Sequence, residues 1–168
     1  MAEIVNKVAQ SGIITIDLEK LIPSGERVLL DLKPWLHMEL ILREAEFRKH
    51  LETHSWKDYE GKFVAVHCSA DAIIPAWAYM LIAIELQPYA QMIVQGNLQK
   101  LEEEIVSSAI ASLNPDEYMD QRVVIKGCSG TKIPASSYMT LTVFLKPLAR
   151  SIMYGEPCST VPVYKKKK

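Results

Sequence analysis

The chain has 168 residues, of which 49% are hydrophobic and 23% charged, and its formal net charge is −1. This apolar content is enough to bury a core, and it excludes disorder for most of the chain as well as collagen-like and low-complexity classes. A net charge near zero gives no basic surface for phosphates, so a general nucleic-acid binder is excluded. We expect one domain over residues 1–168.

The cysteine count and the apolar stretches indicate the cellular compartment. Three cysteines, Cys68, Cys128 and Cys158, cannot all pair in disulfides, and a chain of this length does not need them to fold. The N-terminal residues show no basic segment followed by an apolar one, and the longest uncharged apolar stretch, residues 72–84, is too short to span a membrane. We therefore expect a cytoplasmic protein without a membrane partner, whose thiols are reduced and available to metals or to chemistry.

The predicted elements alternate between strands and helices along the chain. Short β-branched runs predict strands at residues 13–16, 28–30, 63–66 and 122–125, and two further runs predict strands at residues 91–94 and 151–154. Apolar spacing predicts amphipathic helices over residues 36–51 and 98–113, and shorter helices that begin near Pro75 and Pro134. Residues 163–168 are expected to form a solvated basic tail. This alternation predicts an α/β fold with a mainly parallel sheet.

Two segments of the chain, residues 59–96 and 118–155, share one pattern. Cys68-Ser69 aligns with Cys128-Ser129 after one inserted glycine, and an Ile-Pro-Ala triplet, a Tyr-Met pair and a closing glycine also match. Each segment is predicted to form a strand, a Cys-Ser loop, a helix and a second strand. We interpret the two segments as tandem repeats within one domain and expect a pseudo-twofold relation between its halves.

All three cysteines share a local pattern, because each is followed by serine and, a few residues later, by an apolar residue and proline. The repeat places Cys68 and Cys128 at the C-terminal end of a strand and before an uncapped helix, at the edge where open α/β sheets bind ligands. A helix N-terminus also favours the thiolate that binds metal. We therefore predict a trithiolate site of Cys68, Cys128 and Cys158, which would hold zinc or an iron–sulfur cluster.

Two residues beside the cysteines are candidates for a fourth ligand: His67, which precedes Cys68, and Glu156, which stands two residues before Cys158. The second repeat has Lys126 in the place of His67, so the histidine is not part of the shared pattern. Two alternatives to a metal site stay open. One is a thiol-dependent enzyme, in which a cysteine nucleophile uses a neighbouring histidine or carboxylate as its base. The other is an interaction module whose cysteines are inert small hydrophobes.

At these residues the sequence resembles a bacterial family known only as domain of unknown function 2480. The resemblance covers nearly the whole chain and is most specific at residues 152–162, Ile-Met-Tyr-Gly-Glu-Pro-Cys-Ser-Thr-Val-Pro, and at Lys126-Gly127-Cys128-Ser129. The family has no established activity. Its members look to be encoded near iron–sulfur assembly genes, so the resemblance implies an accessory role and iron–sulfur assembly proteins as partners. The sequence sets neither the metal nor the oligomeric state.

Overall fold

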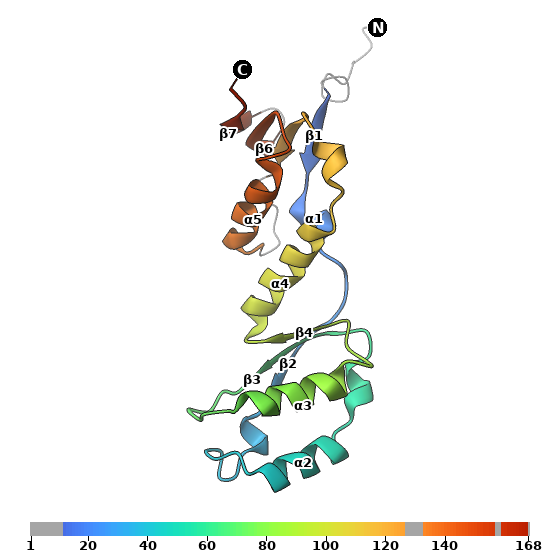
Figure 1. The fold of residues 1–168 in the computed structure, drawn as a ribbon, viewed down its shortest axis with the longest axis vertical. Coiled ribbons are helices and arrows are strands. Elements are labelled where there is room, and N and C mark those ends of the chain that lie inside the picture. Colours follow the sequence, from blue (N-terminus) through green and yellow to red (C-terminus); the bar gives the residue numbers. More distant parts are fainter. Residues whose placement is uncertain (1–11, 127–132, 157–158, 168) are drawn as a thin grey trace, which may run out of the picture. The chain divides into compact units, whose positions relative to one another are not determined.

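The computed structural model describes residues 12–126, 133–156 and 159–167, and the chain divides into two compact units (Figure 1). Unit 1 comprises Met1–Pro23 and Ile105–Lys168, and unit 2 is the continuous stretch Ser24–Glu104. Each unit has a sheet and a hydrophobic cluster of its own. The apolar residues that we expected to bury a core therefore form two clusters, one in each unit.

Unit 2 is built on a parallel three-stranded sheet in the order β2-β3-β4. The central strand β3 is buried along its Phe-Val-Ala-Val run, as expected for a parallel strand with both faces covered. Buried side chains of β2 and β3 pack against those of α2 and α3. In chain order the elements are β2 (Arg27–Asp31), η1 (Lys33–Trp35), α2 (Glu44–Thr53), η2 (Trp56–Tyr59), β3 (Phe63–His67), α3 (Ala76–Leu86) and β4 (Met92–Gln95).

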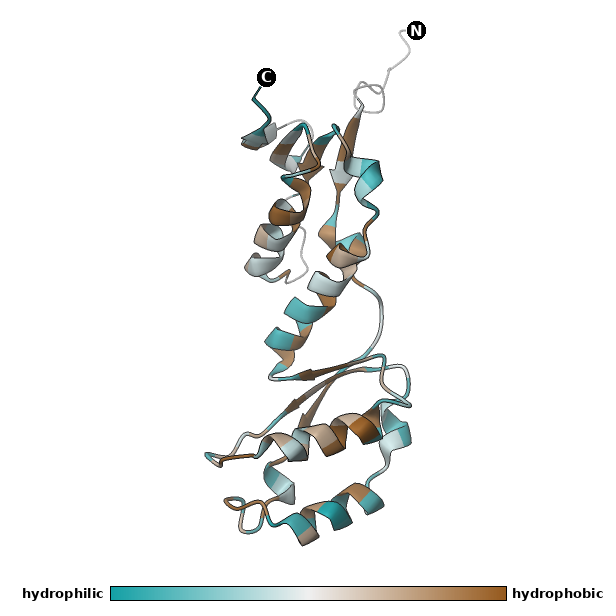
Figure 2. Cartoon of the chain, in the orientation of Figure 1, coloured by the Kyte–Doolittle hydropathy of each residue, from teal (hydrophilic) through white to brown (hydrophobic). Residues whose placement is uncertain are grey.

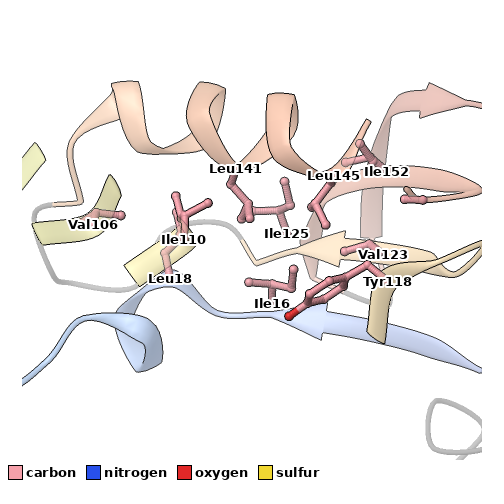
Figure 3. Packing of buried hydrophobic residues seen from close by; sticks show 11 residues of the cluster. Ile16, Leu18, Val106, Ile110, Tyr118, Val123, Ile125, Leu141, Leu145 and Ile152 are labelled. Atoms are coloured by element: carbon pink, nitrogen blue, oxygen red, sulfur yellow. The ribbon is translucent and has the colours of Figure 1, made fainter. Parts of the chain in front are cut away.

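Unit 1 contains a four-stranded sheet in the order β1-β5-β6-β7, in which the first three strands are parallel and β7 is antiparallel. Leu141 and Leu145 of α5 point toward the sheet residues Val123 and Ile125 and are fully buried (Figure 3). In chain order the elements are β1 (Ile13–Ile16), α1 (Leu18–Leu21), α4 (Leu98–Ala111), which begins in unit 2, η3 (Pro115–Tyr118), β5 (Arg122–Ile125), α5 (Ala135–Leu145), β6 (Ser151–Glu156) and β7 (Ser159–Lys165).

The structure confirms an α/β fold with mostly parallel strands. The elements from η2 to β4 also recur with the same order and spacing: η2, α3 and the first residue of β3 and of β4 each have a counterpart 59 positions later, in η3, α5, β5 and β6. Single backbone contacts follow the same spacing. The Gly61 amide donates to Tyr89, and the Asp120 amide donates to Leu148, both at 2.9 Å.

Two predicted elements were wrong in their bounds. Residues 36–51 do not form one helix, because Met38 and Glu39 adopt positive φ in a tight turn, and α2 begins only at Glu44. Residues 163–168 are not simply a solvated tail, because Val163 to Lys165 belong to β7, and Tyr164 and Lys165 pair with β6. Alternating β-branched and aromatic residues ahead of the lysines favour this strand.

The helices of unit 2 differ sharply in hydropathy. Figure 2 shows α2 mostly in hydrophilic colours, whereas α3 is apolar over most of its length. Although Ala78, Ile82 and Leu86 of α3 are fully buried, Met80 and Ile84 on its outer face are exposed. Across the part of the chain that is described, no helix combines the length and apolar character needed to cross a membrane.

Candidate functional site

The predicted site residues of unit 2 lie at the carboxyl ends of its parallel strands. Asp31 ends β2 and His67 ends β3, and the sheet register places these two residues side by side. The His67 Nε2 atom lies 3.9 Å from Asp31 Oδ1. Cys68 follows directly after β3, where it is a free, half-buried thiol.

The Asp31 carboxylate is the most connected polar group at this edge. It accepts hydrogen bonds from the backbone N–H of Lys33 at 3.0 Å, from the backbone N–H of Ser69 at 2.9 Å and from the Ser69 hydroxyl. Burial alone raises the pKa of this carboxyl, but the Ser69 and Lys33 hydrogen bonds and the charge of His67 hold the pKa below its ordinary value of 3.8. The ionised Asp31 therefore fixes the loop that carries Cys68.

Tyr79 of α3 lies within electrostatic reach of Cys68. Burial raises the pKa of the Tyr79 hydroxyl, a hydrogen bond to Gln95 of β4 opposes that rise, and the charge of Cys68 adds to it. The helix begins as the sequence predicts, since Pro75 occupies its N-cap and makes no side-chain cap hydrogen bond. A histidine–aspartate pair, a thiol and a phenol thus gather at one edge of the unit 2 sheet.

Unit 1 has a corresponding acid–base pair at the carboxyl edge of its own sheet. Asp17 follows β1 and Lys126 follows β5, and Lys126 Nζ lies 3.4 Å from Asp17 Oδ2. The Asp17 side chain is only 13% exposed and accepts a hydrogen bond from the backbone N–H of Glu19 at 3.2 Å. This bond has the same two-residue spacing as that from Lys33 to Asp31, so the two aspartates form the same local turn.

A cavity of about 440 Å³ opens beside the Asp17–Lys126 pair. Both residues of the pair line it together with Lys20 and Glu156, and its other walls come from β1, α1 and Tyr118. Because parallel sheets bind ligands beyond the carboxyl ends of their strands, this cavity lies at the expected edge.

The predicted ligands fall into two groups. His67 and Cys68 belong to unit 2, and Glu156 belongs to unit 1. Cys128 and Cys158 lie outside the described residues, so the structure does not test their part in the site. Within the described ranges, no group of three His, Cys, Asp or Glu side chains is placed to hold a metal ion.

Comparison with known proteins gives a family and no activity. A family model described as "Protein of unknown function (DUF2480)" matches residues 2–166. The chain belongs to this family. Neither the curated proteins nor the solved structures contain a match. The family therefore confirms the resemblance seen in the sequence and adds nothing on chemistry.

Sequence reasoning missed Asp17 and Asp31 as partners of the basic residues. A signal was present, because each aspartate follows an apolar run in the sequence and precedes a leucine, Leu18 or Leu32, that is buried in the structure. This signal does not identify the basic partner of each aspartate. The strands 13–16 and 28–30 are close in sequence, but they pair with β5 and β3, which lie in different units.

Proposed function

We propose that the protein binds a zinc ion or an iron–sulfur cluster through the thiolates of Cys68, Cys128 and Cys158. One observation carries this proposal. Lys126 and Glu156, which precede Cys128 and Cys158 by two residues each, line the same cavity.

Two carboxylates of this cavity are candidate ligands beside the thiolates. Strands β5 and β6 are parallel neighbours, with Ile125 opposite Tyr154, so the chain leaves both strands at one edge of the sheet. Asp17 and Glu156 add carboxylate oxygens, which zinc accepts beside thiolates. The ammonium groups of Lys20 and Lys126 favour thiolate over thiol in their surroundings. These groups would supply ligands and charge balance in unit 1.

The proposal also includes the origin of the two units. The repeated element order, the Gly61 and Asp120 backbone bonds and the matching Asp31 and Asp17 turns support two copies of one duplicated unit, with unit 2 inserted between Pro23 and Ile105 of unit 1. The pseudo-twofold relation between the copies and the equivalence of their Cys-Ser loops stay predictions.

The cellular setting follows from the chemistry. Thiolate ligands need a reducing compartment, so we place the protein in the cytoplasm. A cluster-binding protein of this family would act as an accessory to iron–sulfur assembly and would take assembly proteins as partners. Both statements rest on the metal proposal.

The test uses protein purified without oxygen. We expect bound zinc or iron in the wild-type chain, with a cluster absorption spectrum in the case of iron, and loss of that metal in Cys128→Ser and Cys158→Ser. Metal binding should raise the melting temperature, because a ligand at about 100 times its Kd stabilises the folded state by about 2.7 kcal/mol. Serine is close to cysteine in size, so its cavity effect is small.

The Cys68→Ser variant separates two forms of the proposal. Loss of metal supports the three-cysteine site, whereas retention restricts the site to Cys128, Cys158 and the carboxylates of unit 1. The proposal fails if the wild-type chain holds no metal and gains no thermal stability from added zinc or from cluster reconstitution.

A second candidate function is thiol chemistry at Cys68. The observation that favours it is the position of this free thiol beside Tyr79, at the same edge as the Asp31–His67 pair. A histidine held by a carboxylate is the usual partner of a cysteine nucleophile. Faster alkylation of Cys68 than of the other two cysteines, reduced by His67→Ala, would favour this function.

A further inference from the structure

The two sheets differ at one edge. In unit 1, β6 is covered by the antiparallel strand β7, whereas in unit 2 the strand at the corresponding position, β4, ends the sheet. Taking the spacing of 59 positions, Met92 to Gln95 correspond to Ser151 to Tyr154, which all pair with β7. The residue after β4, Gly96, has φ +144°, and its counterpart Gly155 has φ +124°. Both glycines thus adopt a positive φ at corresponding positions of the two sheets.

The open edge of β4 lacks the usual protection against pairing. Strand β7, which forms the outer edge of unit 1, carries Pro162 and Lys165, and proline and lysine are devices that discourage a further strand. Strand β4 has the sequence Met-Ile-Val-Gln, with neither charge nor proline. In the sheet that the structure describes, β4 has a neighbouring strand on one side only, so its outer backbone groups have no strand partner there.

A cavity of about 460 Å³ lies next to this edge. Its walls come from Ile93 and Gln95 of β4 and from Tyr79, Met80 and Ala83 of α3, so it is mostly apolar. The same position in unit 1 shows what such a space can hold. Tyr164 of β7 stands opposite Ile152, the counterpart of Ile93, and packs against the unit 1 core.

From this comparison we infer that β4 docks an extended segment of a partner protein, which adds to the unit 2 sheet as an antiparallel strand. The partner segment alternates β-branched and polar residues and places an aromatic side chain opposite Ile93, in the cavity beside Met80. Backbone hydrogen bonds supply affinity in this mode of recognition, and the side-chain cavity supplies specificity. The inference rests on the proposed duplication and is independent of the metal site.

A peptide fits this edge better than a second copy of the chain. Strand β4 has four residues, and pairing two such strands across a twofold axis buries far less than the roughly 800 Å² per partner of a stable interface. A single peptide strand needs no such area, because it also inserts a side chain into the cavity.

The probe is a synthetic peptide with the sequence of residues 159–165, Ser-Thr-Val-Pro-Val-Tyr-Lys, added to the full chain. We expect saturable binding by fluorescence anisotropy, weakened about tenfold or more when the peptide carries Tyr164→Ala, a loss of the kind seen for aromatic anchors. In the protein, Met80→Lys should weaken binding to a similar degree, because it puts a charge into the cavity. Its matched control is Met139→Lys, at the corresponding exposed position of α5, which should leave binding within about twofold.

Amide hydrogen exchange gives a second readout that does not depend on any variant. The N–H groups of β4 that do not face β3 should exchange fast in the free protein and slowly with the peptide, while β6 amides stay unchanged. Slow exchange of all β4 amides in the free protein, whether or not it depends on protein concentration, would show that the chain or a second copy already covers the edge and would overturn the inference. So would an absence of peptide binding to protein with an unaltered melting temperature.

Discussion

At the scale of single residues, the two units share an acid and differ in its basic partner. Asp31 pairs with His67, and Asp17 pairs with Lys126, at matching ends of the two sheets. The imidazole of histidine has a ring nitrogen that can accept a hydrogen bond, whereas the ammonium group of lysine is a donor only. The carboxyl ends of the two sheets therefore offer different chemistry beside the same acid.

The Asp31 carboxylate gives a prediction with a definite pH dependence. Its pKa is lower in the folded chain than in the unfolded one, so its contribution to stability is complete above about pH 5 and is lost as the pH falls below 4. We expect Asp31→Ala to cost about 1–2 kcal/mol at pH 7, because three hydrogen bonds to a partly exposed carboxylate are lost. Urea unfolding at pH 7 and pH 3 measures this cost.

The control for that prediction is Asp31→Asn, which keeps a side-chain oxygen that can accept the backbone N–H bonds and removes the charge. At pH 7 the free energy of unfolding of Asp31→Asn should lie between those of the wild-type chain and Asp31→Ala. At pH 3 the difference between the wild-type chain and both variants should shrink. An equal difference at the two pH values would mean that the charge of Asp31 does not contribute.

Local sequence reasoning located the positions of the site better than their contacts. Cys68 follows a buried strand and precedes an uncapped helix, as predicted, because strand propensity and proline placement are local properties. The partnership of His67 with Asp31 was not predictable in this way, because it depends on which strands become neighbours. That choice is made by long-range packing.

At the scale of elements, strands were predicted where β-branched runs are continuous, and β7 was missed. Its residues lie next to four lysines, and Pro162 interrupts the run. Proline is compatible with this strand because β7 is at the edge of the sheet. The lysines and Pro162 thus made the C-terminal residues look unlike a strand, and β7 forms through its pairing with β6.

The β6–β7 hairpin gives a prediction for Gly155. Its φ is +124°, and a Cβ atom there would lie 2.5 Å from the backbone oxygen of Ser159. We expect Gly155→Ala to destabilise the protein by about 3 kcal/mol or more, because backbone strain and a contact with another strand add together. The matched control is Gly61→Ala, where φ is +69° and a Cβ atom meets nothing within 4 Å. It should cost only about 1 kcal/mol. Equal costs in chemical denaturation would contradict the role of β7 at Gly155.

At the scale of the whole molecule, the division into two units could not be read from the periodicity of the chain. The same kind of apolar run predicts both β1 and β2 as strands, yet β1 pairs with β5 and β2 pairs with β3. The partner of β1 lies 109 positions later, since Ile13 is opposite Arg122, whereas Arg27 is opposite Phe63. This difference arises because unit 2 lies between the two segments of unit 1 in the sequence. Local apolar patterns do not indicate such an insertion.

Two separate hydrophobic clusters predict that a core defect stays within its unit. Ile82 of α3 and Leu141 of α5 stand 59 positions apart, and both are fully buried. We expect Ile82→Ala and Leu141→Ala each to cost about 2–5 kcal/mol, the range for deleting a large aliphatic side chain from a core. Amide exchange should accelerate in β2, β3 and α3 for Ile82→Ala, and in β1, β5 and α5 for Leu141→Ala, because each cluster lines only its own sheet. The exposed variants Met80→Ala and Met139→Ala are the controls and should alter neither pattern. Acceleration throughout the chain for either core variant would show one cooperative unit instead of two.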